Sequence, residues 1–583
     1  MVMFNFLIEE KIEKRQYQFD DAAEIVRVGG EGKNCGLVYP TGTGKTLTAF
    51  IALDHYLPRG KVLILAHTNP LCQQHCRDAR ALFNLPEAEV NLLVGKVSDK
   101  KRAALWRQSR IVVATPQTIM SEINKGTIDC SNVAFAVFDE MHMANKKYDY
   151  VEIAVLCRSM NIRVLGLTAS SGNAERIRIL EKNYGLRHWI YRSIHDEEIR
   201  RFIFPKSERP VVLDYPEEMK IALRSLRARI FKLHNNLAET RLIEPIQKPE
   251  DWDRRLPFCR LTEMNELFPR LKRYVDAKKR EESFGNGGST WYRYIVLYGA
   301  YYKLMHLFNL FVTEGYEIAW RYLLELEEQA RQPKDGVASS VRHQRNVAER
   351  ILNNRDFARF RYVLQELVFE KKAHPKTAKL FELLQPSLAR GEKVLLFSNY
   401  KETLDILRAE FALKNIGADI IAGNQFMKVK DQQAVIARFA AGEFPVLLAT
   451  TVVEAGIHIP KIDVVVNYSM PLTGIAQIQR GGRAGRTAVG LIYYLIMDNS
   501  NDSSLYFAAR ATNKTMDRAL KREQRIQQIE KEEPGKHMLR VKQPDLPFKS
   551  GLPETQSKRN GSRRMKSLSK KVVQTELFPV KKE

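Results

Sequence analysis

Cysteine is scarce in this sequence, and a secretion-type N-terminus is missing. Six cysteines among 583 residues are too few for a disulfide-stapled fold. Residues 1–14 carry no basic stretch ahead of their short apolar run, so they do not resemble a secretory signal. These absences exclude the class of small disulfide-rich secreted proteins and predict a soluble intracellular protein.

The sequence also lacks a long hydrophobic run that is free of polar residues. Residues 294–312 are long enough to cross a bilayer. Lys303, His306 and Asn309 lie in the middle of that run, where charged and polar side chains are costly in lipid. We therefore expect a buried helix of a soluble domain at this position.

Acidic residues are outnumbered by basic ones. The chain has 68 Asp and Glu against 93 Lys and Arg, a formal net charge of +25. Such an excess favours a polyanionic partner, with nucleic acid ahead of an acidic membrane surface. Hydrophobic residues make up 44% of the chain, which is enough for sizeable cores and excludes wholesale disorder.

Hydrophobic periodicity divides the chain into four regions. Residues 1–205 and 374–515 both alternate short apolar runs with helical patterns, which predicts two α/β domains with parallel sheets. Residues 206–373 show helical spacing with few strand-like runs, which predicts an all-helical insert. Residues 516–583 begin as a helical extension and continue as a basic tail that we expect to be disordered.

The strongest local motif is PTGTGKT at residues 40–46, between an apolar run and a helical pattern. A strand, a glycine-rich turn and a helix N-terminus form a cradle for phosphate. In such a loop Lys45 reaches the β- and γ-phosphates of ATP, and Thr46 holds Mg²⁺. Tyr39 stands where this pattern often begins with Gly or Ala. The predicted nucleotide-binding residues of the loop are Thr41, Gly42, Thr43, Gly44, Lys45 and Thr46.

Two further motifs supply the remaining chemistry of phosphoryl transfer. In VFDEMHMA an apolar run ends at Asp139, a candidate Mg²⁺ ligand, and Glu140, a candidate for orienting or deprotonating the attacking water. In QIQRGGRAGR, residues 477–486, Arg483 and Arg486 are candidates for stabilising the transferred phosphoryl group. Taken alone, this last segment would be interpreted as a basic nucleic-acid patch.

These three motifs, in this order, resemble a superfamily 2 helicase, which implies two RecA-like domains that use ATP and Mg²⁺. The resemblance implies further roles. Arg15, Tyr17 and Gln18 would form the adenine-reading Q motif, and Gln479 would open motif VI. Contacts with the nucleic-acid backbone would come from Thr68 of motif Ia, Thr115 and Pro116 of motif Ib, and Thr450 of motif V.

Motif III would be Thr168-Ala169-Ser170, linking the ATP and strand sites, and motif IV would be residues 397–400. In motif V, residues 449–460, Gly456 would meet the nucleotide. His458 departs from the family, which usually has Asp there near the ribose. This leaves the ribose contact or the tuning of hydrolysis open.

Within superfamily 2, residues 10–515 resemble the archaeal helicase–nuclease Hef and the related Fanconi anaemia M and Mph proteins. The motifs YPTGTGKT, VVATPQTI and EFPVLLATTVVEAGIHIP carry this resemblance, together with the position of the helical insert. In that family the insert resembles a polymerase thumb and grips branched DNA. The nuclease of Hef would follow residue 515, and the remaining residues lack its acidic–basic cluster, so we expect a motor without nuclease activity.

The insert carries its own signals for nucleic-acid binding. Basic side chains gather on one predicted helix, namely Arg270, Lys272, Arg273, Lys278 and Lys279. We expect these residues to contact phosphates, although a solvated helix face is the alternative. Trp291, Tyr292 and Arg293 follow a glycine-rich loop and are candidates for base stacking. We expect the aromatic residues of 294–302 to pack in a core, because the surrounding run is apolar.

Two further patterns are weaker signals. Cys72 and Cys76, with His75 between them, lack a second ligand pair, so we do not expect a metal or iron–sulfur site there.

The basic tail contains two candidate partner motifs. The peptides Gln543–Phe548 and Gln574–Phe578 resemble short motifs that dock in sliding clamps, a pattern of low specificity.

The sequence therefore predicts an ATP-dependent DNA helicase or translocase that acts on forked or branched DNA, in the nucleoid-containing cytoplasm or the nucleus. One alternative is an RNA-directed ATPase, because the RIG-I-like and Dicer motors share these motifs and an insert. No residue distinguishes a 2′-hydroxyl contact. A second alternative is a decayed motor kept as a nucleic-acid-binding scaffold, which only His458 favours.

Overall fold

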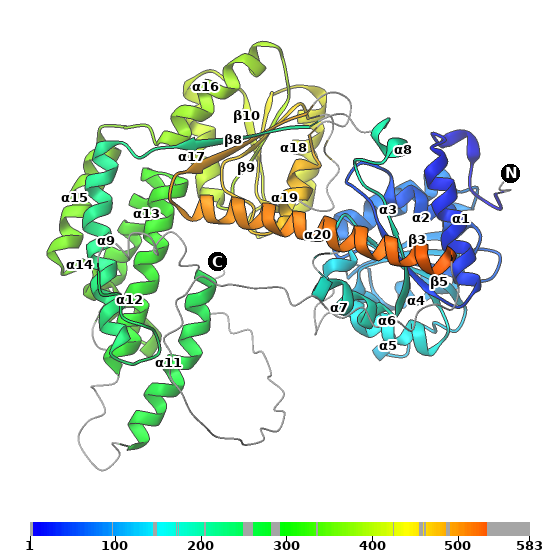
Figure 1. Ribbon diagram of the computed structural model, residues 1–583, viewed down its shortest axis with the longest axis horizontal. Coiled ribbons are helices and arrows are strands. Elements are labelled where there is room, and N and C mark those ends of the chain that lie inside the picture. The colour runs from blue at the N-terminus through cyan, green and yellow to red at the C-terminus, as the bar shows by residue number, and fades with distance from the viewer. Residues whose placement is uncertain are drawn as a thin grey trace. The chain divides into compact units, whose positions relative to one another are not determined.

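The computed structural model describes most of the chain, namely residues 4–95, 97–143, 149–170, 172, 174–202, 206–248, 261–281, 292–333, 336–423, 425–453, 459, 462–484 and 490–532. Two compact units divide it at residue 527. Of the second unit, 528–583, the structure describes only the end of helix α20 (Asn501–Glu532). Both α/β domains and the helical region lie in the first unit (Figure 1).

Seven parallel strands form the first sheet, in the order β3-β4-β2-β5-β6-β1-β7. Most of their residues are buried, as apolar runs in a parallel sheet covered on both faces should be. The strands are β1 (Asn34–Val38), β2 (Lys61–Leu65), β3 (Val90–Leu93), β4 (Ile111–Ala114), β5 (Val133–Phe138), β6 (Arg163–Thr168) and β7 (Leu186–Tyr191).

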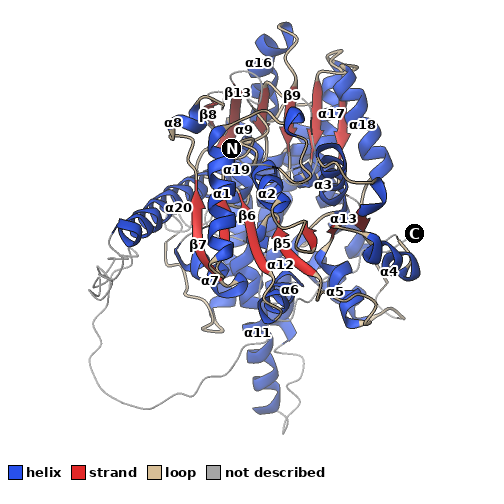
Figure 2. Cartoon of the chain, turned by 90° about the vertical axis from the view of Figure 1, so that its right-hand side faces the viewer, coloured by secondary structure: helices blue, strands red, loops and turns tan. Residues whose placement is uncertain are grey.

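Helices alternate with these strands along the chain, and Figure 2 shows several of them against the sheet. They are α1 (Gln16–Gly30), α2 (Lys45–Asp54), α3 (Asn69–Leu82), α4 (Asp99–Gln108), α5 (Pro116–Asn124), α6 (Asp149–Ser159), α7 (Ala174–Tyr184) and the short α8 (Glu197–Arg200). Apolar residues form one core on each face of the sheet.

Six parallel strands form the second sheet, in the order β10-β11-β9-β12-β13-β8. They are β8 (Lys206–Leu213), β9 (Val394–Phe397), β10 (Ala418–Ile421), β11 (Val446–Ala449), β12 (Val464–Asn467) and β13 (Gly490–Met497). The helices of this domain are α16 (Pro375–Ala389), α17 (Lys401–Leu413), α18 (Val429–Ala441), α19 (Gly474–Gly481) and α20. The prediction of two parallel-sheet domains in tandem is confirmed.

Two of the predicted region limits differ from the structure. The first residues of the predicted insert, 206–213, are not helical but form β8, which pairs with β13 from Lys206↔Gly490 to Leu213↔Met497. This strand lies at the sheet edge, where charged residues are tolerated, so its sequence lacks a continuous apolar run. The predicted limit at residue 515 falls inside α20, since neither Gly nor Pro interrupts residues 501–532.

The remainder of the insert is helical, as predicted. Its helices are α9 (Glu217–Ala238), α11 (Leu261–Glu281), α12 (Tyr292–Asn309), α13 (Tyr316–Arg331), α14 (Ser339–Leu352) and α15 (Arg355–Phe369), with a π-helical turn, η5 (Leu310–Glu314). The expectation for the aromatic run is confirmed, because Tyr294, Tyr298 and Tyr301 are buried in the core of the insert.

One helix among the described residues, Tyr292–Glu314, is long and apolar enough to cross a membrane. Its most apolar stretch has a mean hydropathy of 1.2, and 72% of that stretch is buried inside the protein. Its residues belong to the core that α9, α12, α13 and α15 share. The burial agrees with the core helix expected from the sequence.

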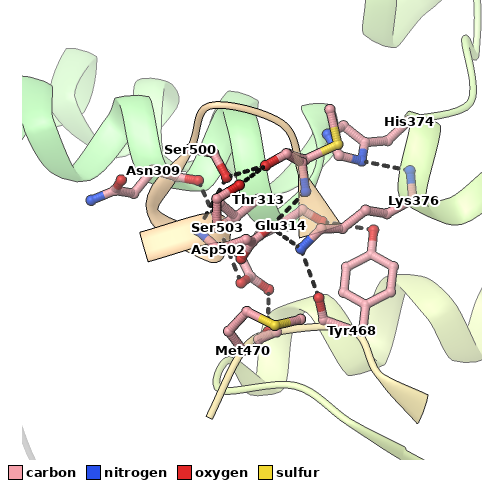
Figure 3. Close-up of polar contacts among 12 residues, drawn as sticks. Asn309, Thr313, Glu314, His374, Lys376, Tyr468, Met470, Ser500, Asp502 and Ser503 are labelled. Carbon is pink, nitrogen blue, oxygen red and sulfur yellow. Dashed lines mark hydrogen bonds and ion pairs between the residues drawn. The ribbon is translucent and has the colours of Figure 1, made fainter. Parts of the chain in front are cut away.

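Buried polar contacts join the insert to the second sheet, and one of them is the hydrogen bond that the hydroxyl of Tyr468 donates to the carbonyl of Glu314 at 3.1 Å (Figure 3). The carboxylate of Glu314, from η5, accepts hydrogen bonds from the hydroxyls of Ser398 at 3.2 Å, Thr403 at 3.1 Å and Ser469 at 2.9 Å. Burial raises the pKa of Glu314, and the charge of Lys376 only partly opposes it. The π-helical turn thus inserts its last side chain among residues that follow β9 and β12.

Candidate active site

The predicted motifs of the first domain follow the carboxyl ends of its strands. The P-loop follows β1, Asp139 and Glu140 follow β5, and Thr168 ends β6. Because all strands are parallel, these ends meet at one edge of the sheet, which is the usual position of ligand sites in open α/β sheets. The structure thereby brings together Lys45 and Glu140, which are 95 positions apart in the sequence.

The P-loop has the backbone that a phosphate cradle requires. Gly42 and Gly44 adopt φ angles of +86° and +87°, a region that favours glycine. Gly44 caps helix α2, and Lys45 is the first residue of that helix. The hydroxyl of Thr43 donates to the carbonyl of Pro40 at 2.7 Å and closes the turn. Thr41 and Thr46 are half-buried beside it.

Two residues of the predicted Q motif lie against the backbone of the P-loop. The hydroxyl of Tyr17 and the amide of Gln18 both donate to the carbonyl of Thr43, at 2.7 and 2.9 Å. A side chain at Gly44 would collide with Gln18 Nε2 at 2.1 Å. Gln18 Oε1 is buried and accepts no hydrogen bond within the described chain, so it remains available for a ligand. The predicted adenine contact of Tyr17 and Gln18 is not tested.

Arg15 and Tyr39 also have defined surroundings. The guanidinium of Arg15 pairs with Glu13 at 2.7 Å and lies over the ring of Phe202. Tyr39, in the unusual first position of the loop, donates to Asp21 at 2.5 Å. Arg192 holds that same carboxylate with two hydrogen bonds, at 2.7 and 2.8 Å. Tyr39 therefore ties the loop to helix α1.

Lys45 and Glu140 form an ion pair at the carboxyl ends of the strands of the first sheet. Lys45 Nζ lies 3.4 Å from Glu140 Oε1, and both side chains are nearly buried. Burial alone would raise the pKa of Glu140, but the charge of Lys45 and the imidazole of His142 outweigh burial, so that pKa lies well below its usual range. Glu140 is therefore ionised at neutral pH, as a residue that orients or deprotonates water must be.

Three histidines surround the carboxylates, and no sequence motif predicts a role for them. His75 Nε2 lies 2.8 Å from Asp139 Oδ2, and His142 Nδ1 lies 3.3 Å from Glu140 Oε2. His67 is close enough for Glu140 and Asp139 to influence it, while burial lowers its pKa. The three histidines come from separate segments of the chain. Only His142, two residues after Glu140, lies close enough in the sequence for its proximity to the carboxylates to be predicted.

The carboxylates fit a magnesium-bound nucleotide. Asp139 is buried, and its Oδ1 accepts the backbone N–H of Glu140 at 2.9 Å. Glu140 Oε2 is also buried, with His142 Nδ1 at 3.3 Å as its polar neighbour. Oxygen donors of this kind suit Mg²⁺, which retains waters and is held by one or two carboxylates together with phosphate oxygens. No group of three or more His, Cys, Asp or Glu among the described residues forms a metal cage by itself.

Motif III contacts the histidine that follows the carboxylates. His142 Nδ1 lies 3.1 Å from the hydroxyl of Thr168, and that hydroxyl donates to the carbonyl of Ser170 at 2.7 Å. The backbone N–H of Ser170 donates back to Thr168 at 3.1 Å. A chain of contacts therefore runs from Glu140 through His142 to Thr168 and Ser170. These contacts lie at the ATP-site end of the predicted link to the strand site, and the link itself stays a prediction.

The predicted nucleic-acid contacts of motifs Ia and Ib lie at helix starts of the first domain. Thr68 caps α3 and accepts the N–H of Leu71 at 3.4 Å. Thr115 precedes α5, whose first residue is Pro116, and its hydroxyl contacts that of Thr118 at 2.8 Å. Both threonines follow strand ends, β2 and β4. Helix N-termini favour phosphate, which agrees with the predicted role.

The second domain arranges motifs IV, V and VI along its own strand ends. Arg480, on α19, is fully buried and donates to the carbonyl of Ser469 at 2.8 Å and to Asn399 Oδ1 at 2.7 Å. Gln479 is buried on the same helix, and Arg483 follows it, half-buried. Thr450, after β11, lines a cavity of about 390 Å³ together with residues of motif IV.

Several predicted site residues lie outside the described chain, so the structure gives no account of them. They are Gly456, His458, Arg486, Trp291 and the tail peptides Gln543–Phe548 and Gln574–Phe578. On α11, Lys272 and Arg273 are exposed, while Arg270 donates to the carbonyl of Leu242 at 3.0 Å. Lys278 is half-buried on the same helix, and Lys279 also belongs to it.

Comparison with known proteins agrees with this arrangement. Residues 19–177 match the family described as DEAD/DEAH box helicase, and residues 375–488 match the helicase conserved C-terminal domain. The crystal structure of the Hef helicase domain from Pyrococcus furiosus is 32% identical, with a TM-score of 0.62; the match covers 86% of this chain and 99% of that one.

Two curated proteins are also similar. A putative ATP-dependent RNA helicase of Methanocaldococcus jannaschii is 28% identical over 526 residues, which is 88% of this chain and 62% of that protein. The ATP-dependent DNA helicase Mph1 of Neurospora crassa is 26% identical over 531 residues, 87% of this chain and 43% of that protein. The chain thus spans about half the length of these relatives.

A P-loop that faces an Asp-Glu pair in one parallel-sheet domain, followed by a second such domain with motifs IV to VI, defines a superfamily 2 helicase. Within this class, the match over nearly the whole Hef helicase domain is decisive. The chain belongs to the Hef helicase family.

Proposed function

We propose that the chain is an ATP-driven DNA helicase or translocase that remodels forked or branched DNA during fork repair or recombination. The observation that carries this proposal is the pairing of Lys45 with Glu140 at 3.4 Å beside the buried carboxylate of Asp139. This is the residue set that phosphoryl transfer requires. A decayed motor would have no reason to retain it.

In this proposal the residues of the first domain bind and orient ATP. The N–H groups of the P-loop and Lys45 hold the phosphates, Glu140 orients the attacking water, and Asp139 and Thr46 hold Mg²⁺. When bound, the metal neutralises charge that develops on the phosphates. Arg483 and Arg486 of the second domain approach the nucleotide when the two domains close. Thr68, Thr115, Pro116 and Thr450 contact the strand.

The insert would select the DNA structure. Its exposed basic residues on α11 are suited to phosphate contacts, and η5 places Glu314 among residues of motif IV. An event at the insert therefore has a buried connection to the second domain. Activity on DNA would place the protein with the nucleoid or in the nucleus, and a clamp that binds the tail would bring it to replication forks.

The test is steady-state ATPase activity of the full chain at one fixed salt concentration, with forked DNA, linear duplex DNA, single-stranded DNA and duplex RNA. We expect the strongest stimulation from forked DNA, followed by strand displacement on the same substrate. Lys45→Ala should abolish turnover and leave DNA binding intact. Strongest stimulation by duplex RNA would replace the DNA proposal with an RNA-directed one, and no turnover would favour the scaffold.

A further inference from the structure

Helix α3 carries a buried histidine to the predicted metal ligand of the ATP site. His75 is 2% exposed, and its Nε2 lies 2.8 Å from Asp139 Oδ2. A carboxylate that holds a cation can only accept hydrogen bonds, so in such a site Nε2 would carry the proton and donate it. The other oxygen, Oδ1, accepts the N–H of Glu140 at 2.9 Å. Each oxygen of Asp139 therefore has one donor that fixes the carboxylate plane.

The contact has features that a merely structural histidine would lack. His75 Nδ1 is buried, yet it has no hydrogen-bond partner within the part of the chain that the structure describes. A buried polar atom without a partner costs free energy. A hydrophobic residue would fill this position at lower cost, so the bond to Asp139 is the interaction that the ring provides.

The same helix begins at a predicted nucleic-acid contact. Thr68 caps α3 shortly after the end of β2 at Leu65, and His75 follows two turns later. A rigid helix therefore joins the backbone-binding residue of motif Ia to the carboxylate of motif II. Cys72 and Cys76 lie on the same helix, are buried, and belong to the core of the first domain. Neither cysteine shares the contact with Asp139.

We propose that His75 is a positioning residue for Asp139, and that its N–H sets the affinity of the ATP site for the divalent cation that accompanies the nucleotide. This inference rests on the proposed ATPase function. Partners of metal-binding carboxylates typically contribute 10–100-fold to metal affinity or activity. No metal is expected to bind Cys72 and Cys76 directly, and in this proposal His75 acts on the cation through Asp139.

The test measures binding of a fluorescent ADP analogue to the full chain during titration with Mg²⁺, and again in EDTA. His75→Leu keeps much of the side-chain volume and removes the donor. His75→Gln retains an N–H that reaches toward Asp139. We expect His75→Leu to raise the Mg²⁺ midpoint about 10–100-fold, with the affinity in EDTA unchanged, and His75→Gln to recover most of the loss. Cys76→Ala, a buried change on the same helix, should leave the midpoint unchanged.

Three results would overturn the role of His75. They are a wild-type Mg²⁺ midpoint in His75→Leu, an equal loss of affinity in Mg²⁺ and in EDTA, or a His75→Gln variant that binds no better than His75→Leu. If His75→Leu fails to fold, His75→Phe, which also lacks the N–H donor, takes its place in the same titration; a raised Mg²⁺ midpoint supports the role and a wild-type midpoint overturns it. If the affinity of the wild-type chain for the ADP analogue does not depend on the Mg²⁺ concentration, the proposed ATP site itself is overturned.

Discussion

Glu140 is the residue whose surroundings most directly define its chemistry. It adopts a φ of +50°, a strained value for a non-glycine residue, and Lys45 and His142 hold its pKa below the usual range against the effect of burial. Glu140→Gln keeps the shape and removes the charge. Because positioned bases contribute about 10²–10⁴-fold, we expect DNA-stimulated ATP turnover to fall by at least about 100-fold.

The measurement is phosphate release at saturating forked DNA, with nucleotide affinity recorded in parallel. Affinity should remain within about threefold of the wild type, since Lys45 and the P-loop are unchanged; this bound corresponds to about 0.7 kcal/mol. Glu152→Gln is the matched control, because Glu152 is an exposed glutamate on the neighbouring helix α6. Turnover close to wild type in Glu140→Gln would contradict the assignment of this carboxylate.

We expect the stability of the second domain to depend on pH through His374. Its Nδ1 accepts the N–H of Lys376 at 3.3 Å and caps α16. Burial, followed by the charge of Lys376, lowers its pKa to about 3. The unfolded chain binds a proton below about pH 6.5 while the folded chain does not, so stability is complete above that pH and falls as the pH drops toward 3, by about 1.4 kcal/mol per unit.

The pH effect is tested with His374→Asn, which preserves a side-chain cap but does not titrate. Between pH 7.5 and 5.5 the wild type should lose about 1.4 kcal/mol more than the variant, seen as a larger fall in the thermal midpoint of the second domain. His195→Asn, at an exposed histidine, should follow the wild type at every pH. Parallel pH curves for the wild type and His374→Asn would refute the burial effect.

At the scale of elements, a buried ion pair joins the starts of helices α16 and α20. Lys376 Nζ lies 2.6 Å from Asp502 Oδ2, with side-chain exposures of 0% and 4%, and also donates to the carbonyl of Tyr468 at 2.7 Å (Figure 3). Removing one partner of a buried pair leaves an uncompensated charge. We expect Lys376→Met to destabilise the domain by about 3–5 kcal/mol.

The partner variant separates the charge effect from simple loss of packing. Lys376→Met combined with Asp502→Asn removes both charges, so the double variant should be more stable than Lys376→Met alone in urea unfolding. A matched exposed pair is Lys379 and Glu382, 2.5 Å apart on α16; removing Lys379 should cost at most about 1 kcal/mol. A double variant that is no more stable than the single one would exclude a buried charge as the cause.

What the sequence predicts at this scale depends on how local each signal is. Consecutive residues carry the patterns of the P-loop, the strand before Asp139 and the core helix at 294–312, and the structure contains all three elements. Strand β8 was missed because an edge strand needs no continuous apolar run. His75 and Glu314 were missed for another reason: their partners are 64 and 84 or more residues away in sequence, and no single-sequence pattern reports such a contact.

At the scale of the whole molecule, the net charge of +25 raises the question of which surface would bind the proposed DNA substrate. Nonspecific attraction of DNA depends on the total charge of the protein, whereas direct contacts with phosphates depend on where the basic side chains lie. Lys272 and Arg273 are exposed on helix α11 of the insert. If both contact phosphates, Lys272→Ala with Arg273→Ala should weaken forked-DNA binding and reduce the slope of log K against log salt by about 2.

The comparison that isolates position from charge is Lys100→Ala with Lys101→Ala, which removes two exposed cations from α4 of the first domain. Both double variants lower the net charge equally, so a general electrostatic effect would change both slopes by the same amount. We expect the α11 variant alone to lose about two phosphate contacts and also the preference for forked over linear DNA. Because the ATP residues are untouched, its basal ATPase activity should remain at the wild-type level. This combination of results would assign the proposed DNA selection to the insert and hydrolysis to the motor domains.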